Sequence, residues 1–569
     1  MPRLRALCRS RSTKHPLGGE RAIVRCCETS WNADSLAVGQ IILLSASLER
    51  FVAASPARRL AVSLLLILLI WAGIYLPRLG RMELHGEEGR RILPGVTMLE
   101  TGNWLVPYVG GKPYLRKPPM VNWLAAISFE ATGHQDEWSA RLPSVIAVLL
   151  LTLGAYLCSR RWLGEDHALL AAIAILSTVC LLDKGRLIEI EALYVASFGL
   201  GLVVWLGARA LWLRWILSAL PLGFGLLLKG PLHLLFFYGI VVLILWRQRR
   251  LSELRSFAQL CAVVLMVAIF TAWAVPHLQT PEARTATKEW SDQFTGRLAL
   301  QEFHWKDWLL NYPRALCNFL PWILFLPFGM GLEGRRNQEN EPFIFGLEFG
   351  SLITFLIVML APGALPRYIM PLLVPVCLLA AYRIKQAPSL NRPWKYILMG
   401  LTAVLLLASA VGLFFSHERI FIGLAVILCG ANLLFLGPLR YRNPESQTTT
   451  LTVGTGILTV AAIFFYVDAI LPRMPETLRQ RAALIAKIVP PGQTIYAVDP
   501  GPQPLFFYLR KPWSYISDWN QLPQNAKYVL AGGRSEPGLA QRFGQNAQLL
   551  LSYRDRGEKE FGLYSIGSK

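Results

Sequence analysis

Apolar residues in this chain occur in long runs that are separated by short polar segments. Each run approaches the length of a helix that crosses the hydrocarbon core of a bilayer, which needs about 20 residues. The pattern therefore predicts an α-helical polytopic membrane protein with about thirteen transmembrane helices. The predicted spans are 59–76, 142–158, 167–182, 191–212, 213–229, 231–246, 258–276, 313–331, 344–361, 366–383, 395–415, 419–437 and 450–471.

The composition supports a membrane protein and excludes a soluble one. Hydrophobic residues make up 54% of the 569 residues, charged residues only 16%, and the mean hydropathy is +0.40. The net charge of +21 does not indicate nucleic acid binding, because Lys and Arg form short clusters between apolar runs. We expect these clusters in cytoplasmic loops. They are Arg160-Arg161, Arg247–Arg250, Arg335-Arg336, Arg383–Lys385 and Arg440–Arg442.

These basic clusters also predict the orientation of the chain. They place the N-terminus in the cytoplasm, and an odd number of spans then places the C-terminus outside. Residues 1–58 are rich in Arg and lack a clear amphipathic period, so we expect a basic, disordered cytoplasmic tail. The nine cysteines show no CxxC or Cys/His spacing, so the sequence predicts neither a disulfide framework nor a metal cluster.

Two of the predicted external segments have unusual polar and aromatic residues. In segment 77–141, the apolar stretch Val121–Phe129 follows two prolines, which favour the first turn of a helix, so we expect a short interfacial helix. Segment 277–312 combines Trp and Tyr with charged residues, a composition typical of the membrane interface.

The composition changes after the last apolar run. Residues 473–569 contain alternating short helix and strand patterns, which predict a small soluble α/β domain outside the cytoplasm. The expected helices are 476–488, 503–509 and 537–543, and the expected strands are 494–498, 528–531, 548–552 and 561–566.

An ordered set of polar motifs lies in the first external segment. It consists of Glu87-Glu88-Gly89-Arg90-Arg91, Gly102-Asn103-Trp104, Lys117-Pro118-Pro119 and Arg141-Leu142-Pro143. This order resembles the first extracytoplasmic loop of the polyprenyl-phosphate-sugar-dependent glycosyltransferases of the C type. That superfamily contains protein O-mannosyltransferases and the bacterial lipid A aminoarabinose transferase. Its members typically have Asp-Glu-Ala-Arg-Tyr at the acidic pair, so the first acid is Glu here where Asp is usual.

Three later positions extend the resemblance. Lys229-Gly230-Pro231 is similar to the Lys-Gly-Pro of the family, and a lysine among apolar residues is costly unless it reaches water or an anion. Pro366-Arg367-Tyr368 opens a motif that is similar to the family's Pro-x-Tyr-x-x-Pro. Arg186 and Glu191, with four residues between them, take the place of the family's Arg and Asp. Without the resemblance, Lys229 could be a snorkelling lysine and Tyr368 an aromatic residue of the interfacial belt.

The resemblance implies roles for these side chains. Glu87, Glu88 and Glu191 are expected to be catalytic, because a carboxylate can accept the proton of an attacking hydroxyl. If the acceptor is an ionised phosphate, Glu87 would instead position it or hold a divalent cation, and no other cofactor is implied. The residues expected to bind the donor phosphate are Lys229, Arg367, Lys117 and Arg90. The residues expected to contact substrate or the interface are Trp104, Tyr368, Arg186 and Arg141.

The implied function is transfer of one sugar from a polyprenyl monophosphate to an acceptor on the external face of the membrane, with inversion at C1. Residues 59–472 would form the transferase domain of a monomer in the bacterial inner membrane. The acceptor could be lipid A, a protein or another envelope glycan, and the donor sugar is equally open. A transporter or flippase of lipid-linked sugars is the alternative, but internal repeats and midplane polar residues, which are typical of transporters, are not evident.

Overall fold

A computed structural model describes most of the chain after the N-terminal segment. The described residues from Ser55 onward belong to one compact unit, and residues 1–54 of the predicted tail lie outside the described part. The described ranges are 55–283, 288, 304–328, 340–437, 444–474, 477–498, 504–532, 536–554 and 560–566.

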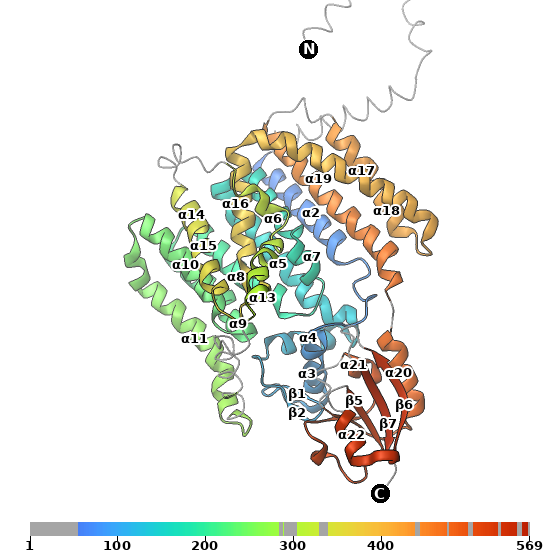
Figure 1. The fold of residues 1–569 in the computed structure, drawn as a ribbon. Coiled ribbons are helices and arrows are strands. Elements are labelled where there is room, and N and C mark those ends of the chain that lie inside the picture. The colour runs from blue at the N-terminus through green and yellow to red at the C-terminus, as the bar shows by residue number, and fades with distance from the viewer. Residues whose placement is uncertain are drawn as a thin grey trace, which may run out of the picture. The chain divides into compact units, whose positions relative to one another are not determined.

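Nine helical segments in the described part of the chain are long and apolar enough to cross a membrane. The chain is therefore a multi-pass membrane protein (Figure 1). Five are the single helices α2 (Pro56–Tyr75), α5 (Glu137–Leu163), α8 (Ile190–Gly207), α9 (Leu211–Lys229) and α11 (Phe257–Leu278). The others are Glu341–Met359, with α14 (Glu341–Phe345) and α15 (Ser351–Met359); Pro366–Gln386, with η5 (Pro366–Leu372) and α16 (Leu373–Gln386); Pro388–Phe415, with α17 (Asn391–Phe415); and Ser446–Ile488, whose apolar part lies in α19 (Pro444–Phe465). Two shorter apolar helices are α10 (Leu232–Arg247) and α18 (Ile420–Leu436).

The predicted count of thirteen spans is not confirmed. The expected span 167–182 is interrupted between α6 (Glu165–Leu176) and α7 (Val179–Lys184). At the interruption, the hydroxyls of Ser177 and Thr178 donate to the carbonyls of Ile173 and Ala174, at 2.7 and 2.6 Å. Hydroxyl side chains that bond to the backbone in this way compete with the helical pattern. The expected span 313–331 overlaps α13 (Trp305–Cys317), which ends inside it.

The helices differ greatly in how much of their surface is covered. In α8, 83% of the apolar window is buried, as expected for a helix that is hydrophobic on all sides, whereas in the α17 segment only 17% is buried. Thus α8 lies in the interior of the bundle, and α17 presents its apolar side chains outward, where a bilayer would cover them.

The first external segment folds into short elements next to the bundle. They are α3 (Glu88–Thr101), β1 (Tyr108–Val109), β2 (Lys112–Pro113) and α4 (Met120–Thr132). The expected short helix after Lys117-Pro118-Pro119 is thereby confirmed as α4. The two helices of this segment pack together, and the Asn122 amide of α4 donates to the carbonyl of Arg91 in α3 at 2.7 Å.

The C-terminal part contains a five-stranded mixed sheet in the order β4-β3-β5-β7-β6. Helices and strands lie at the seven predicted places, and β4, a four-residue edge strand after Pro512, was not predicted. That this part is a separate, extracytoplasmic domain stays a prediction. The strands are β3 (Ile495–Val498), β4 (Trp513–Ile516), β5 (Tyr528–Gly532), β6 (Ala547–Arg554) and β7 (Glu560–Ile566), and the helices are α20 (Thr477–Ile488), α21 (Leu505–Leu509) and α22 (Glu536–Phe543).

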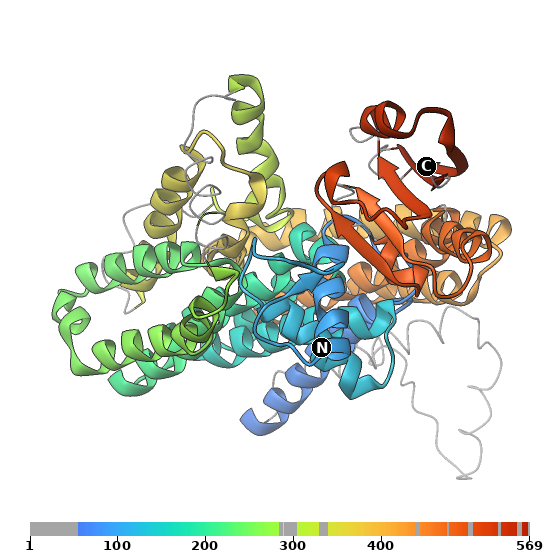
Figure 2. The same ribbon diagram turned by 90° about the horizontal axis from the view of Figure 1, so that it is seen from below.

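Residues far apart in the sequence meet at this sheet. The C-terminal elements, red in Figures 1 and 2, lie beside α3 and α4, which are blue. The ring of Phe129 in α4 stacks on Phe507 in α21, with 6.2 Å between the ring centroids. The amide of Tyr515 in β4 donates to the carbonyl of Gly110, between β1 and β2, at 2.8 Å.

Candidate active site

The centre of the candidate site is an ion pair between the ends of two membrane helices. Glu191 lies in the first turn of α8, and Lys229 is the last residue of α9. The Lys229 ammonium donates to the Glu191 carboxylate at 3.2 Å, and the two side chains are only 11% and 8% exposed. The ammonium also lies over the ring of Tyr368, 5.3 Å from its centroid. The structure thus brings together three residues that the sequence predicted separately.

A break between two helices places Lys229 at this site. Gly230 has a φ of +89°, a conformation that favours glycine, and it separates α9 from α10. The hydroxyl of Tyr194 accepts from the amide of His233 at 2.7 Å and donates to the Gly230 carbonyl at 3.1 Å. The Tyr194 ring lies 5.7 Å from the Lys229 ammonium. Tyr194 therefore stabilises the break between α9 and α10 and places its ring near the Lys229 ammonium. This role was not predicted from the sequence.

Two further cations act on the same pair. The guanidinium groups of Arg367, in η5, and Arg91, in α3, are close enough for electrostatic interaction with both Glu191 and Lys229. Arg367 is half-buried and forms no hydrogen bond or ion pair with another residue that the structure describes. Glu191 therefore interacts electrostatically with three cations, of which Arg91 also pairs with Glu87. Arg367 adds positive charge that is suited to an anionic ligand.

Arg91 connects this cluster to the acidic motif. Its guanidinium lies 3.2 Å from the Glu87 carboxylate and donates to the Tyr114 hydroxyl at 3.0 Å. Arg90 pairs with the same Glu87 carboxylate at 3.1 Å, and the Glu87 side chain stays 28% exposed. Arg91 was not predicted as a site residue. It stands where the resembling family has Tyr, and this difference could have pointed to it. Glu87 is therefore held at the accessible edge of a continuous group of charges.

Glu88 differs from its neighbour, because it is completely buried. Arg141, which is only 1% exposed, binds both Glu88 oxygens at 2.9 and 2.8 Å. The same guanidinium donates to the carbonyls of Leu79 and Met82 at 2.7 and 2.9 Å. Burial alone would raise the pKa of the Glu88 carboxyl, but Arg141 and the hydrogen bonds outweigh it and hold the pKa well below its usual range. This geometry gives both residues a role in positioning.

Two more of the predicted residues, Arg186 and Lys117, lie in the segments that precede α8 and α4. Arg186 donates to the carbonyls of Ile74 and Pro77, at 2.5 Å in each case, and so binds the end of α2. Lys117 is half-buried in the segment between β2 and α4. Beside Glu191, the buried Glu189 pairs with Lys184 at 3.1 Å, and burial raises the pKa of the Glu189 carboxyl although Lys184 lowers it.

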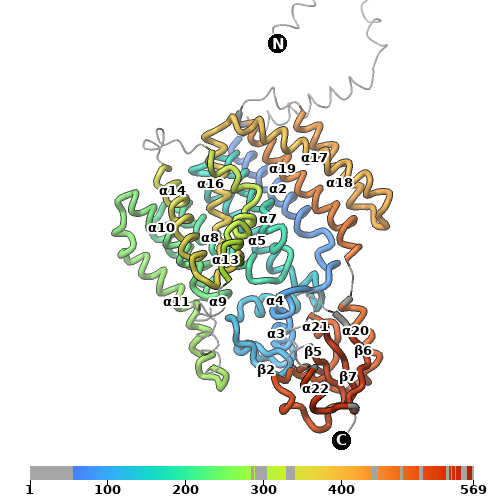
Figure 3. Tube along the Cα trace, viewed as in Figure 1, coloured from blue at the N-terminus to red at the C-terminus, as the bar shows by residue number. Residues whose placement is uncertain are grey.

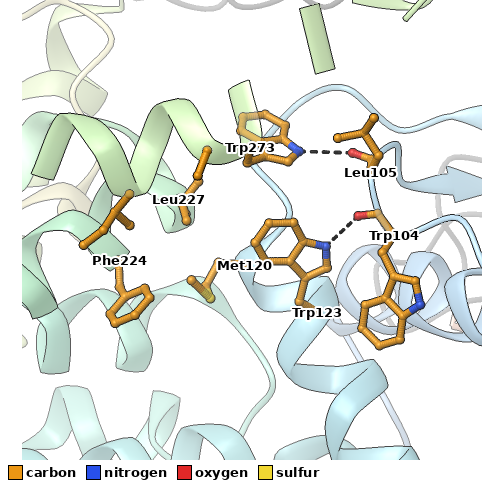
Figure 4. A pocket seen from close by; sticks show the side chains of 9 residues that line it. Trp104, Leu105, Met120, Trp123, Phe224, Leu227 and Trp273 are labelled. Carbon is orange, nitrogen blue, oxygen red and sulfur yellow. Dashed lines mark hydrogen bonds between the residues drawn. The ribbon is translucent and has the colours of Figure 1, made fainter. Parts of the chain in front are cut away.

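An apolar cavity of about 550 Å³ opens near the end of α9. Its wall comes from the segment before β1, from α4, from α9 and from α11 (Figure 4). The indole N–H groups of Trp123 and Trp273 donate to the carbonyls of Trp104 and Leu105, at 2.7 and 3.1 Å, and so fix two of the walls. The lining residues are Trp104, Leu105, Met120, Trp123, Phe224, Leu227, Ile269, Ala272 and Trp273.

The side chains do not fit a resident divalent cation. Within the described ranges, no three His, Cys, Asp or Glu side chains gather as metal ligands. Glu87, the expected candidate, already pairs with two arginines, whose charges would repel a cation. The donor set at this site is suited to binding an anion.

Comparisons with known proteins agree with the motifs. A sequence profile of the dolichyl-phosphate-mannose-protein mannosyltransferase family matches residues 116–275. An undecaprenyl phosphate-alpha-4-amino-4-deoxy-L-arabinose arabinosyl transferase from Pseudomonas paraeruginosa is 29% identical over 319 residues, which cover 53% of this chain and 57% of that protein. One from Edwardsiella ictaluri is 26% identical, over 63% of this chain and 68% of its own length. The match thus spans little more than half of the first of these relatives.

The comparison of structures extends over almost the whole chain. The crystal structure of apo ArnT from Cupriavidus metallidurans covers 93% of this chain and 98% of its own, with a TM-score of 0.64 and 19% identity. This chain has the ArnT fold. The resemblance to the C-type glycosyltransferases is confirmed by the profile match and the sequence relatives together with this fold. The ArnT crystal structure with undecaprenyl phosphate bound also has a TM-score of 0.64, with 18% identity, and covers 90% of this chain and 98% of its own.

Replacing Arg141 with Met tests the buried pair. Glu88 would remain buried without its partner, and we expect a loss of about 3–5 kcal/mol in unfolding free energy near neutral pH. In the wild type, the lowered pKa of Glu88 contributes stability above its ordinary value of 4.5, and this contribution is lost only as the pH falls further. In Arg141→Met, burial would instead raise the pKa, so protonation should restore stability as the pH falls from about 7.5 to about 5.5.

Thermal unfolding of the purified protein in detergent at both pH values measures this effect. Arg81→Met is the control, because Arg81 is 42% exposed and pairs with Glu418 at 3.5 Å, where an ion pair contributes at most about 1 kcal/mol. An Arg141→Met protein as stable as the wild type at about pH 7.5 would contradict the positioning role of the pair.

Proposed function

We propose that this protein transfers a single sugar from a polyprenyl monophosphate donor to an acceptor on the external face of the bacterial inner membrane. The observation that carries this proposal is the group of cations that interact with Glu191: Lys229 and Arg367 lie at the ends of membrane segments, and Arg91 lies in α3. The named activity of the relatives and the undecaprenyl phosphate in the similar ArnT structure support the same substrate class.

The cations would act on the phosphate of the donor. When the bond between the sugar C1 and the phosphate oxygen breaks, the electron pair leaves with the phosphate, and negative charge builds up there. Lys229 offers a compact charge and Arg367 a bidentate one, and both would stabilise the departing polyprenyl phosphate. Lys117 and Arg90 are further candidates for contacts with the phosphate.

The apolar cavity is suited to the first isoprene units of the donor. Leu227, in its wall, lies in the last turn of α9, two residues before Lys229. A polyprenyl chain lying in this cavity would therefore have its phosphate near the ammonium. Trp104 and Trp123 offer flat apolar surfaces to such a chain.

Glu87 would act on the acceptor. The acceptor oxygen attacks C1 from the face opposite the phosphate, which inverts the configuration, and the hydroxyl proton passes to the Glu87 carboxylate. Its pairing with Arg90 and Arg91 fixes the carboxylate in place. For an acceptor that is already an ionised phosphate, Glu87 would orient the nucleophile without taking a proton.

The ends of α8 support the proposed orientation. Glu191 is at its N-terminal end, whereas Arg161 donates to the carbonyl of Gly207 at its C-terminal end, at 3.2 Å. The 18 residues of α8 span about 27 Å, close to the hydrocarbon thickness. Lys385 donates to the carbonyl of Leu163 at 2.9 Å, so two predicted cytoplasmic basic clusters meet opposite the site. We infer a cytoplasmic N-terminus and an external C-terminal part.

Cells that lack this protein should lose one sugar from an envelope component, and mass spectrometry of envelope lipids and proteins identifies the acceptor.

We expect Glu87→Gln to lower transfer roughly 100-fold, because it removes the proton acceptor and keeps the size of the side chain. Glu341→Gln is the matched control, since Glu341 pairs with Arg247 away from the site. Wild-type transfer by a stably expressed Glu87→Gln protein would remove Glu87 from the mechanism.

We expect Lys229→Ala to weaken use of the donor. Loss of one charge-assisted contact to a phosphate costs about 1.5–3 kcal/mol, which corresponds to about a 10- to 150-fold loss. Lys229→Arg keeps the charge but changes the geometry, so it should restore activity only in part. The measurement is titration of a synthetic polyprenyl-phosphate sugar at fixed acceptor, followed by the reverse titration.

The double variant Lys229→Ala/Glu191→Gln is the control for stability, because it removes both charges of the pair. A Lys229→Ala protein with unchanged donor dependence and a raised acceptor requirement would assign this lysine to the acceptor instead.

A reporter that is active only outside the cytoplasm, fused after Lys569, should be active if the C-terminal part is external. Activity of only a cytoplasmic reporter at the same position would reverse the proposed orientation.

A further inference from the structure

The C-terminal part binds the first external segment through a buried carboxylate. Glu83, which is completely buried, precedes the acidic motif by four residues. Its oxygens accept from the amides of Leu478 and Arg479 at 3.1 and 2.8 Å. These amides belong to the first turn of α20, where N–H groups have no partner within the helix and favour negative charge. Glu83 therefore caps a helix that is almost 400 residues away in sequence.

A second group of contacts lies beside this cap. The carboxylate of Glu137, at the start of α5, accepts from the side chains of Arg479 and Tyr508, the latter at 2.7 Å. The Tyr508 hydroxyl in turn accepts from the amide of Leu84 at 2.8 Å. Glu137 and Leu84 are buried, whereas Tyr508 and Arg479 are half-buried. The segment just before Glu87 is thus bonded both to α5 and to the C-terminal part.

The backbone of the C-terminal part also comes close to Gly89, inside the acidic motif. A Cβ atom at Gly89 would lie 3.0 Å from the backbone nitrogen of Pro504 and 3.2 Å from its Cα. Gly89 is a helical residue of α3, and glycine is a poor helix former compared with alanine, the residue that is typical here in the resembling family. The backbone of Pro504, which directly precedes α21, accounts for the glycine.

We propose that the C-terminal α/β part is a positioning element for Glu87, which it holds through Gly89 and the Glu83-capped helix α20. Glu87 is the residue before α3, so the placement of the first turn of α3 sets the place of its carboxylate. The two residues that follow it contact different parts of the chain: Glu88 pairs with Arg141, and Gly89 lies against the backbone of Pro504. In the Cα trace of Figure 3, α3 lies next to α21. The catalytic purpose of this contact rests on the proposed function.

Hydrogen exchange and transfer activity of the full-length protein test the proposal together. Gly89→Ala would displace Pro504, and Glu83→Gln would remove the charge that caps α20. Both variants should increase amide exchange in α3 and lower transfer, by roughly 10- to 100-fold for Gly89→Ala, since small misplacements of a reacting group cost this much. Gly400→Ala in α17 is the matched control, because no atom lies within 4 Å of its added Cβ.

A double-variant cycle separates positioning from general damage. If Gly89→Ala acts by moving Glu87, it should add little to the defect of Glu87→Gln, because the group that it misplaces is already gone. Additive defects would overturn the proposal. Glu83→Gln provides an independent variant should Gly89→Ala fold poorly.

The remaining outcomes are also decisive. Unchanged α3 exchange in both variants would overturn the proposed contact, and raised exchange with full transfer would overturn its catalytic purpose. Wild-type protein that transfers no sugar would refute the proposed function, and exchange would then still report whether the C-terminal part holds α3.

Discussion

The buried ion pair between Glu88 and Arg141 is the interaction on which the structure around the candidate site depends. Arg141 binds both oxygens of Glu88 and the carbonyls of Leu79 and Met82, and Glu88 also accepts from the amide of Ile188 at 3.2 Å. One completely enclosed pair thus joins the end of the first membrane segment, α3, α5 and the start of α8. The places of Glu87 and Glu191 both follow from it, because each lies within three residues of a bonded atom.

The acidic pair illustrates what the sequence could and could not predict. Its importance was evident from the order of the motifs, but two adjacent glutamates are chemically alike in a sequence. Successive residues of a helix point about 100° apart, so the start of α3 directs Glu88 inward to Arg141 and leaves Glu87 partly exposed. Both were expected to be catalytic. The sequence does not give the direction from which Arg141 approaches, and this direction distinguishes the two glutamates in the structure.

The other predictions divide in the same way: local features could be predicted from the sequence, whereas contacts between distant segments could not. Lys229 and Glu191 were predictable because a charge in an apolar run must have a partner, yet their pairing required the helices to be placed. The C-terminal strands were found from local patterns, except the edge strand β4, which begins directly after Pro512. Glu83, Glu137 and Tyr508 were missed because their partners lie more than 340 residues away. The thirteen-span count is not confirmed, in part because Ser177 and Thr178 interrupt an apolar run.

The cluster of Lys229, Arg367 and Arg91 has a consequence for turnover. A polyprenyl-phosphate sugar is a phosphodiester with one negative charge, whereas the polyprenyl phosphate that remains after transfer is a monoester with up to two. In the proposed reaction, the cations that stabilise the departing group would therefore bind the spent carrier more tightly than the fresh donor. Glu191, which pairs with Lys229 at 3.2 Å, offers an anion that competes with the phosphate for the ammonium. In the proposed reaction, Glu191 would pair with the Lys229 ammonium again as the polyprenyl phosphate leaves for the bilayer.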